Sequence, residues 1–331
     1  MRRLAAALIA IAVSSPCPAE QRPEWAFFVP TALPAAKSAV SEAAASEAPA
    51  SEAPAIDVLN PPDWYPAEHP AMPAVVAHGS PPDGARTAPI LPCALCHLPN
   101  GLGHVESASL AGLPADYIIR QLAEFRSGER RITVGDAHAQ QFLSVLKSSY
   151  SDAQVRAAAQ YFSALTPREW IQVREAKRVP VSVVDPDSLM RIAPAGLGTE
   201  PLGSRIVELP ENESALRKRD AHSGFIAYVP EGSVAKGEAL VTSAGEWGVA
   251  CTACHGGTLS GLRGIPPLAG RPPTYLVRQL WNYQSGERRG SMAAPMRAIA
   301  ARLRVDEMLA MAAYLASLPP EPRPPRAAIT F

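Results

Sequence analysis

The stretch Cys251-Thr252-Ala253-Cys254-His255 decides how this chain is interpreted, and it has an earlier counterpart, Cys93-Ala94-Leu95-Cys96-His97. Two thiols three positions apart can each add to one vinyl group of a haem, and the histidine that follows can then bind the iron as its fifth ligand. A Cys-x-x-Cys pair can also be half of a zinc site or a redox dithiol. Because a histidine follows both pairs directly, the sequence favours two covalently bound haem c groups. The predicted attachment and ligand residues are Cys93, Cys96, His97, Cys251, Cys254 and His255.

The beginning of the chain predicts export. Met1-Arg2-Arg3 precedes an apolar run from Leu4 to Val13 and a small-residue section, the three parts of a secretory signal ending at Ala19. The apolar run is shorter than the roughly 20 residues that span a bilayer, so no stable membrane insertion is expected. We therefore expect a periplasmic protein. Lysine and arginine balance aspartate and glutamate, 31 against 31, and no basic patch predicts nucleic-acid binding.

An internal repeat organises the rest of the chain. Cys93 matches Cys251, and 13 of 22 positions are identical between 110–131 and 268–289 at the same offset of 158 residues. Apolar positions within each repeat recur at helical spacing, which predicts a mainly α fold. Residues 167–231 match neither repeat, and their β-rich runs predict a connector with a small β-hairpin. The expected organisation is a signal peptide (1–19), a disordered Ala/Pro/Ser/Glu-rich spacer (20–60), a first haem domain (61–166), the connector (167–231), a second haem domain (232–319) and a C-terminal tail (320–331).

Several motifs in combination resemble tandem di-haem class I cytochromes c. They are Cys-x-x-Cys-His, Leu-Ala-Gly before a Tyr-x-x-x-Gln-Leu helix, a Ser-Gly-x-Arg loop and a last helix ending in Tyr-x-x-x-Leu. The resemblance covers about 71–166 and 232–319, and it implies two small helical domains that each wrap a haem and pass electrons. It also implies that a backbone carbonyl accepts the ring proton of the proximal histidine. Pro266 matches that position in the second copy, whereas the first copy has Ala108.

The sixth iron ligand is expected to differ between the copies. In the second copy Met296 matches the ligand position of the family, with Met292 as the reserve, while Met308 and Met311 are expected in the core. In the first copy the position aligned with Met296 is His138. If His138 binds iron, the first haem is bis-histidine, has the lower potential and passes electrons to the second. The alternatives are a solvent-facing His138, which leaves the iron five-coordinate or bound by His104 or Met190. We expect surface positions for His69, His78 and His222.

These features predict an electron carrier rather than an enzyme. Its partners would be redox proteins, such as a periplasmic dehydrogenase or quinol-oxidising respiratory complex on one side and a terminal oxidase on the other. A di-haem peroxidase is the alternative from the enzyme class, because such enzymes also pair unlike haems. A haem-based ligand-binding module that uses an open first iron is the third hypothesis.

Overall fold

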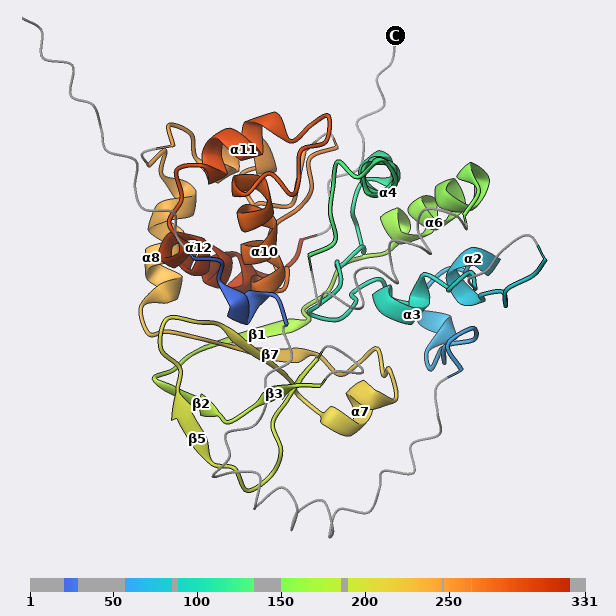
Figure 1. The fold of residues 1–331 in the computed structure, drawn as a ribbon, viewed down its shortest axis with the longest axis horizontal. Helices are drawn as coiled ribbons and strands as arrows, with labels where there is room; N and C mark the ends of the chain where they lie inside the picture. Colours follow the sequence, from blue (N-terminus) through green and yellow to red (C-terminus); the bar gives the residue numbers. More distant parts are fainter. Residues whose placement is uncertain are drawn as a thin grey trace, which may run out of the picture.

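The computed structural model describes residues 21–28, 57–84, 89–133, 150–185, 190–245, 247–262 and 264–321. Two groups of helices lie side by side above a region of small sheets (Figure 1). This mainly helical architecture confirms the coarse fold prediction. Within the described ranges, no helix combines the length and the apolar composition needed to cross a bilayer. The proposed signal peptide, the Ser-Glu-Ala-Pro-Ala repeat at 46–55 and residues 322–331 of the tail lie outside these ranges.

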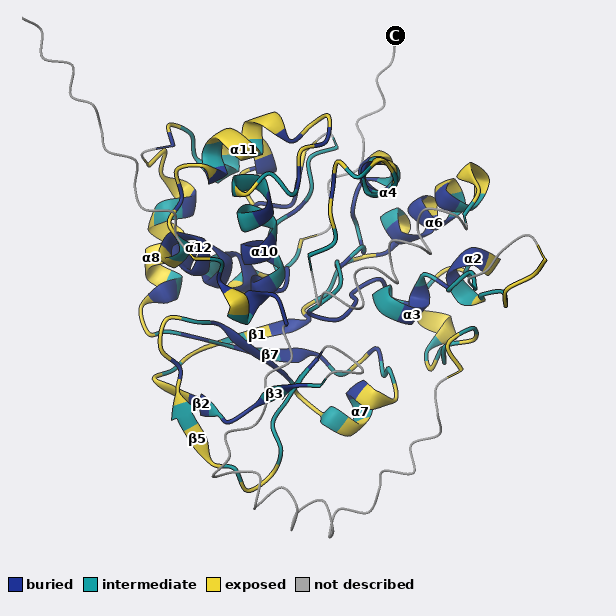
Figure 2. Ribbon diagram, in the orientation of Figure 1, coloured by how far each residue is buried: buried dark blue, intermediate teal, exposed yellow. Residues whose placement is uncertain are grey.

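The second repeat forms the more complete helical group. Its helices are α8 (Ser233–Thr242), α9 (Cys251–His255), α10 (Pro273–Gln284), α11 (Ala294–Ala300) and α12 (Val305–Ser317). Helices α8 and α12 cross very closely, because a Cβ atom on Gly237 would lie 1.9 Å from the carbonyl oxygen of Ala310. Glycine is therefore required at this crossing. Met308 and Met311 lie in the core that these helices enclose, as predicted. Figure 2 shows α12 and α10 largely buried and α11 largely exposed.

The first repeat forms the corresponding group, with α2 (Ala74–Ala77), α3 (Ala94–His97), α4 (Ala115–Ser127) and α6 (Asp152–Ala164). Ser151 begins α6 with a capping box, in which its side chain accepts from the backbone N–H of Gln154. Gly128 ends α4 in a left-handed conformation. The end of α6 packs against the loop that follows α3, because Tyr161 donates to the carbonyl of Pro99 at 2.6 Å.

The connector contains more β structure than the predicted hairpin. Strands β6 (Val207–Pro210) and β7 (Phe225–Val229) do pair in antiparallel fashion, but α7 (Glu213–Arg217) lies between them and β1 (Ile171–Glu175) adds a parallel third strand. Two further two-stranded sheets pair β2 (Arg178–Pro180) with β5 (Thr199–Pro201) and β3 (Val183–Val184) with β4 (Arg191–Ile192). Alternate residues of β7 are buried, and they belong to the cores of both repeats. The connector therefore joins the two helical groups.

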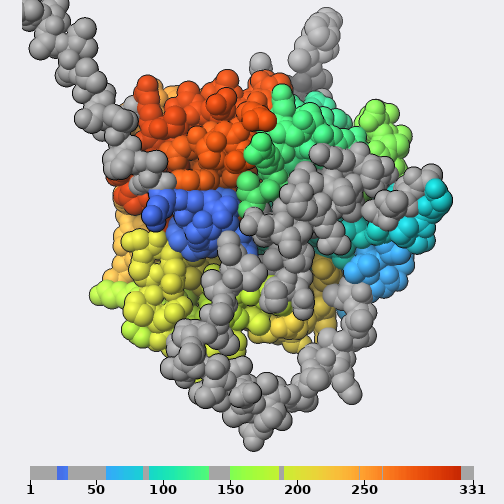
Figure 3. All heavy atoms as spheres, in the orientation of Figure 1, coloured from blue at the N-terminus to red at the C-terminus, as the bar shows by residue number. Residues whose placement is uncertain are grey.

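A short N-terminal segment also lies between the repeats. Ala26, at the end of the turn η1 (Glu24–Ala26), and the two phenylalanines after it are almost completely buried, with Phe27 1% and Phe28 2% exposed. Phe27 belongs to the core of the second repeat and Phe28 to that of the first. Figure 3 shows this segment as a blue patch between the orange helices and the yellow connector. The aromatic residues that begin the expected spacer thus dock on the protein itself.

The two Ser-Gly-Glu-Arg-Arg loops pair with each other across the boundary between the repeats. Arg130 and Arg288 form an antiparallel β-bridge, and their guanidinium groups cross over. Arg130 donates to Gln279 at 2.9 Å, and Arg288 donates to Gln121 at 2.7 Å. Each arginine thus binds the glutamine of the other repeat. These two contacts are equivalent because the two repeats have the same sequence at these positions. They join the two helical groups as a pair of related halves.

Candidate haem attachment sites

Each Cys-x-x-Cys-His motif forms a short helix. Cys93 directly precedes α3 and His97 ends it, while Cys251 begins α9 and His255 ends it. A single turn of helix places the two cysteines three positions apart on neighbouring parts of the same surface. In the described part of the chain, no cluster of three or more His, Cys, Asp and Glu side chains is arranged to hold a bare metal ion. The two cysteines of each motif lie close enough together to fit attachment to the two vinyl groups of one porphyrin.

Both histidine rings are fixed by a backbone carbonyl. His97 Nδ1 lies 2.7 Å from the carbonyl oxygen of Ala108, and His255 Nδ1 lies 2.8 Å from that of Pro266. A carbonyl can only accept, so Nδ1 carries the proton and Nε2 keeps its lone pair for a metal. Burial lowers the pKa of both histidines, which favours the same neutral ring. These are the bonds that the resemblance predicts, and the residues present fit an iron porphyrin.

Three of the four motif cysteines lie in surroundings that disfavour the thiolate. Burial raises the pKa of Cys93 and of Cys96 to about 12, and that of Cys251 to about 11. A redox Cys-x-x-Cys needs the opposite shift, because only a thiolate attacks a disulfide. The surroundings of Cys93, Cys96 and Cys251 therefore argue against the redox alternative.

The candidate sixth ligands are only partly described. Met296 lies on α11 and is half-buried, whereas Met292 is 61% exposed in the loop before it. Burial thus favours Met296 over Met292 in the second repeat. His138 lies outside the described residues. Of the alternatives for the first repeat, Met190 is buried in the first core. His104 is also buried, with Nδ1 3.4 Å from a carboxylate oxygen of Glu106.

The other histidines are not all surface residues. His78 and His222 are exposed, as expected. The side chain of His69, in contrast, is only 5% exposed, so the surface prediction for it is wrong. Its Nε2 lies 3.2 Å from Asp63, its Nδ1 lies 2.9 Å from the carbonyl of Pro70, and its ring packs edge-on against Tyr161. The cause is the segment 57–70, which the sequence assigns to the boundary of a spacer and which instead folds back over the first repeat.

A buried group of charged residues lies where the repeats, the connector and the N-terminal segment meet, and the sequence analysis missed it. Arg278, on α10, donates to the carbonyls of Ala26, Val105 and Glu106 at 2.7, 2.8 and 3.1 Å. Glu208, on β6, accepts from Thr274. Burial raises the pKa of Glu208 to about 7 and lowers that of Arg278 to about 10. Both shifts favour the neutral form, so desolvation outweighs the attraction between the charges. The presence of an arginine at this helix position in both repeats, Arg120 and Arg278, was the available signal.

Comparison with known proteins places the chain among electron-transfer proteins. No protein family model matches it. It is 27% identical to the thiosulfate dehydrogenase electron acceptor of Thiomonas intermedia over 237 residues, 70% of this chain and 80% of that protein. A protein of the same name from Stutzerimonas stutzeri is 24% identical over 238 residues, 71% of this chain and 82% of that protein.

Solved structures of the same kinds of protein are also similar. Thiosulfate dehydrogenase TsdBA from Marichromatium purpuratum matches with a TM-score of 0.46 and 27% identity. The match covers 75% of this chain and 39% of the Marichromatium chain. Cytochrome c4 from Pseudomonas stutzeri matches with a TM-score of 0.43 and 20% identity, covering 68% of this chain and 93% of the other.

A smaller relative is similar over most of its own length. Cytochrome c-554(548) of Halomonas halodenitrificans is 40% identical over 68 residues, which is 20% of this chain and 82% of that cytochrome. A single small cytochrome is therefore matched over most of its length, as expected for a chain that contains such a unit as one domain. The chain belongs to the c-type cytochromes.

Proposed function

We propose that this chain is a periplasmic di-haem cytochrome that accepts single electrons from a thiosulfate-oxidising dehydrogenase and passes them to a respiratory acceptor. Its assignment as an electron carrier follows from the family and from two relatives that are electron acceptors rather than enzymes. The names of these relatives supply the proposed donor. The single observation that carries the assignment is the duplicated motif, in which both histidine rings bind a carbonyl eleven positions later in the chain.

The residues of this chain have defined roles in that function. Each repeat would hold one haem c through two thioether bonds, formed by Cys93 and Cys96 in the first repeat and by Cys251 and Cys254 in the second. A bound haem supplies reversible one-electron chemistry. His97 and His255 are the proximal ligands. The carbonyls of Ala108 and Pro266 hold the Nδ1 protons, which orients each ring and increases its basicity.

The sixth ligands set the two potentials apart. We assign Met296 to the second haem, because it is half-buried and holds the ligand position, and His138 to the first. A thioether is a softer and weaker donor than imidazole and favours ferrous iron. The second haem is therefore the one of higher potential.

Reduction by the donor tests this function directly. The purified holoprotein is mixed with thiosulfate dehydrogenase and thiosulfate, and haem reduction is followed by absorbance, with hydrogen peroxide turnover measured in parallel. The proposal predicts reduction of both haems and no peroxide turnover with a reduced donor. Absence of reduction by this dehydrogenase would reject the donor, and peroxide turnover would support the peroxidase alternative. A spectroelectrochemical titration of the same sample gives both potentials.

A further inference from the structure

The two attachment helices differ in how far they are covered. In the second repeat Ala253 and Cys254 are exposed. The aligned residues of the first repeat are Leu95, which is buried, and Cys96, which is partly buried. Two copies of one domain type would expose this surface equally, so something outside the repeat covers the first copy.

The cover is the end of α7 and the turn after it, residues 216–222 of the connector. Arg219 donates to the carbonyl of Leu95, inside the first attachment motif. Asn100 donates to the carbonyl of Ala221 at 2.8 Å. Leu216 anchors the segment in the core of the first repeat. These contacts attach the connector to the attachment helix and to the turn that follows it.

The backbone of Arg219 indicates that this placement is imposed by its surroundings. Its φ angle is 57°, in the left-handed region that residues with a Cβ atom avoid. Such a conformation persists only when the neighbouring contacts determine it, and it often occurs at functional positions. Here it directs the side chain toward Leu95.

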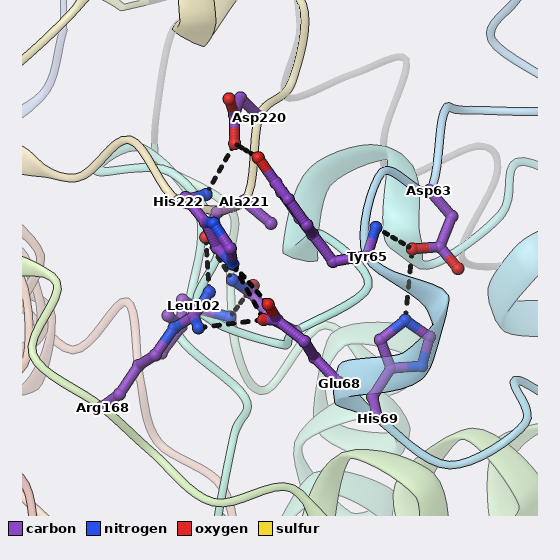
Figure 4. A network of polar contacts seen from close by, with 10 residues as sticks. Asp63, Tyr65, Glu68, His69, Leu102, Arg168, Asp220, Ala221 and His222 are labelled. Carbon is purple, nitrogen blue, oxygen red and sulfur yellow. Dashed lines mark hydrogen bonds and ion pairs between the residues drawn. The ribbon is translucent and has the colours of Figure 1, made fainter.

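A second layer of residues supports the cover from the outside (Figure 4). The ring of Tyr65 stacks on His222 at 3.6 Å, and the Tyr65 hydroxyl donates to Asp220 at 3.0 Å. Glu68 lies 2.8 Å from His222 Nε2 and 3.1 Å from Arg168, whose other nitrogen donates to the carbonyl of Ala221. The folded-back segment 57–70 thereby holds residues 216–222 in position.

We propose that residues 216–222 cap the thioether edge of the first haem, so that partner proteins exchange electrons with the second haem. This inference rests on the proposed haem attachment. The thioether bonds tie one edge of each porphyrin to its two cysteines, so a segment that covers Leu95 and Cys96 also covers that edge. In the second repeat Cys254 is exposed, and Leu262, whose side chain lies 3.5 Å from where a Cβ atom of Gly256 would be, is 43% exposed. Electrons from the donor therefore arrive at the second haem, and the first haem exchanges electrons with the second. This differs from the route predicted from the sequence, in which the first haem accepts the electron.

Hydrogen exchange on the holoprotein tests the cap without reference to activity. Arg219→Gly removes the guanidinium and suits the left-handed backbone, so the fold is retained. Lys218→Ala is the matched control, because it removes the same charge from an exposed neighbour. We expect Arg219→Gly to accelerate exchange several-fold in 93–100 and to leave 251–258 unchanged, while Lys218→Ala changes neither. Equal exchange rates of the two motifs in the wild type, or no response to Arg219→Gly, would overturn the cap.

Stopped-flow oxidation of the reduced holoprotein by hexacyanoferrate(III) tests the consequence for electron transfer. Arg219→Gly should accelerate only the slower of two phases. Leu262→Glu, which places a negative charge near the second attachment motif, should slow only the faster phase, and Ala239→Glu at an exposed site on α8 should change neither. If Arg219→Gly and Leu262→Glu changed the same phase, the two haems would not differ in their access to the reagent, and the inference would be refuted. Because this reagent replaces the dehydrogenase, failure of the proposed donor leaves the result unaffected.

Discussion

Replacement of Glu208 by glutamine should make the protein more stable at alkaline pH and leave its stability at acid pH nearly unchanged. Glu208 lies on β6 and is 1% exposed. One carboxylate oxygen accepts from Thr274, and the other is buried without a hydrogen-bond partner among the described residues. The charged groups that face it are Arg278 and Glu106. Glutamine keeps the size of the side chain and the acceptor for Thr274, but it cannot ionise.

The sign follows from the pKa of the folded state. Burial raises the pKa of Glu208 from its ordinary 4.5 to about 7, whereas the unfolded chain keeps the ordinary value. The contribution of this group to stability is therefore fully present below pH 4.5 and is lost as the pH rises through about 7. At about 1.4 kcal/mol for each pKa unit, the shift of two and a half units corresponds to a loss of about 3 kcal/mol. Glutamine removes this loss.

Denaturant unfolding of the holoprotein at about pH 5 and about pH 8 measures this difference. We expect the variant to exceed the wild type by about 3 kcal/mol at the higher pH and by less than about 1 kcal/mol at the lower. Glu238→Gln, which neutralises an exposed carboxylate on α8, is the control and should follow the wild type. If Glu208→Gln gave the same advantage at both pH values, or none at the higher one, the carboxyl would not be held protonated by burial.

Three further predictions concern the haems. The intact mass should exceed that of the apoprotein by two haems, and acid–acetone extraction should not remove them, because four thioether bonds attach them. Met296→His should lower the potential of the second haem and abolish the weak long-wavelength absorbance of iron–sulfur ligation, whereas Met292→Leu should do neither; loss of that band in Met292→Leu alone would reassign the ligand. His138→Met should raise only the lower of the two potentials. Each tenfold change in the one-electron equilibrium corresponds to about 59 mV. Unchanged potentials would show that His138 does not bind iron.

The helices of the two repeats could be predicted from the sequence because their determinants are local. Apolar spacing defines the buried face of α10, and residues near Ser151 define the start of α6. The close crossing at Gly237 depends on a residue that the sequence shows directly, because only glycine leaves room for the carbonyl of Ala310. The proximal histidine bonds followed from the resemblance rather than from any pattern, because a carbonyl acceptor has no side-chain signature.

The remaining features depend on contacts between distant segments. The strand β1 has the alternation of a half-buried strand, Ile-Gln-Val-Arg-Glu, but nothing local shows that β7 lies beside it in parallel. His69 is buried because segment 57–70 folds onto Tyr161, more than ninety positions later in the chain. Similarly, Glu208 and Arg278 meet only because the connector packs against α10. Such contacts arise from tertiary structure, and the periodicity of apolar residues along the sequence does not predict them.

The unequal cover of the two attachment motifs originates outside the duplicated sequence. Where the two Ser-Gly-Glu-Arg-Arg loops meet, the contacts are equivalent, since Arg130 and Arg288 each bind the glutamine of the other half. These paired loops do not distinguish one haem from the other. The segments that contact the repeats unequally are the connector, whose Arg219 reaches only the first attachment helix, and segment 57–70, which holds it there. A difference in partner access thus requires no change in the haem motifs themselves. Changes in residues 216–222 can alter partner access while the potentials set by the iron ligands stay the same. The cap variants and the ligand variants must therefore be measured separately.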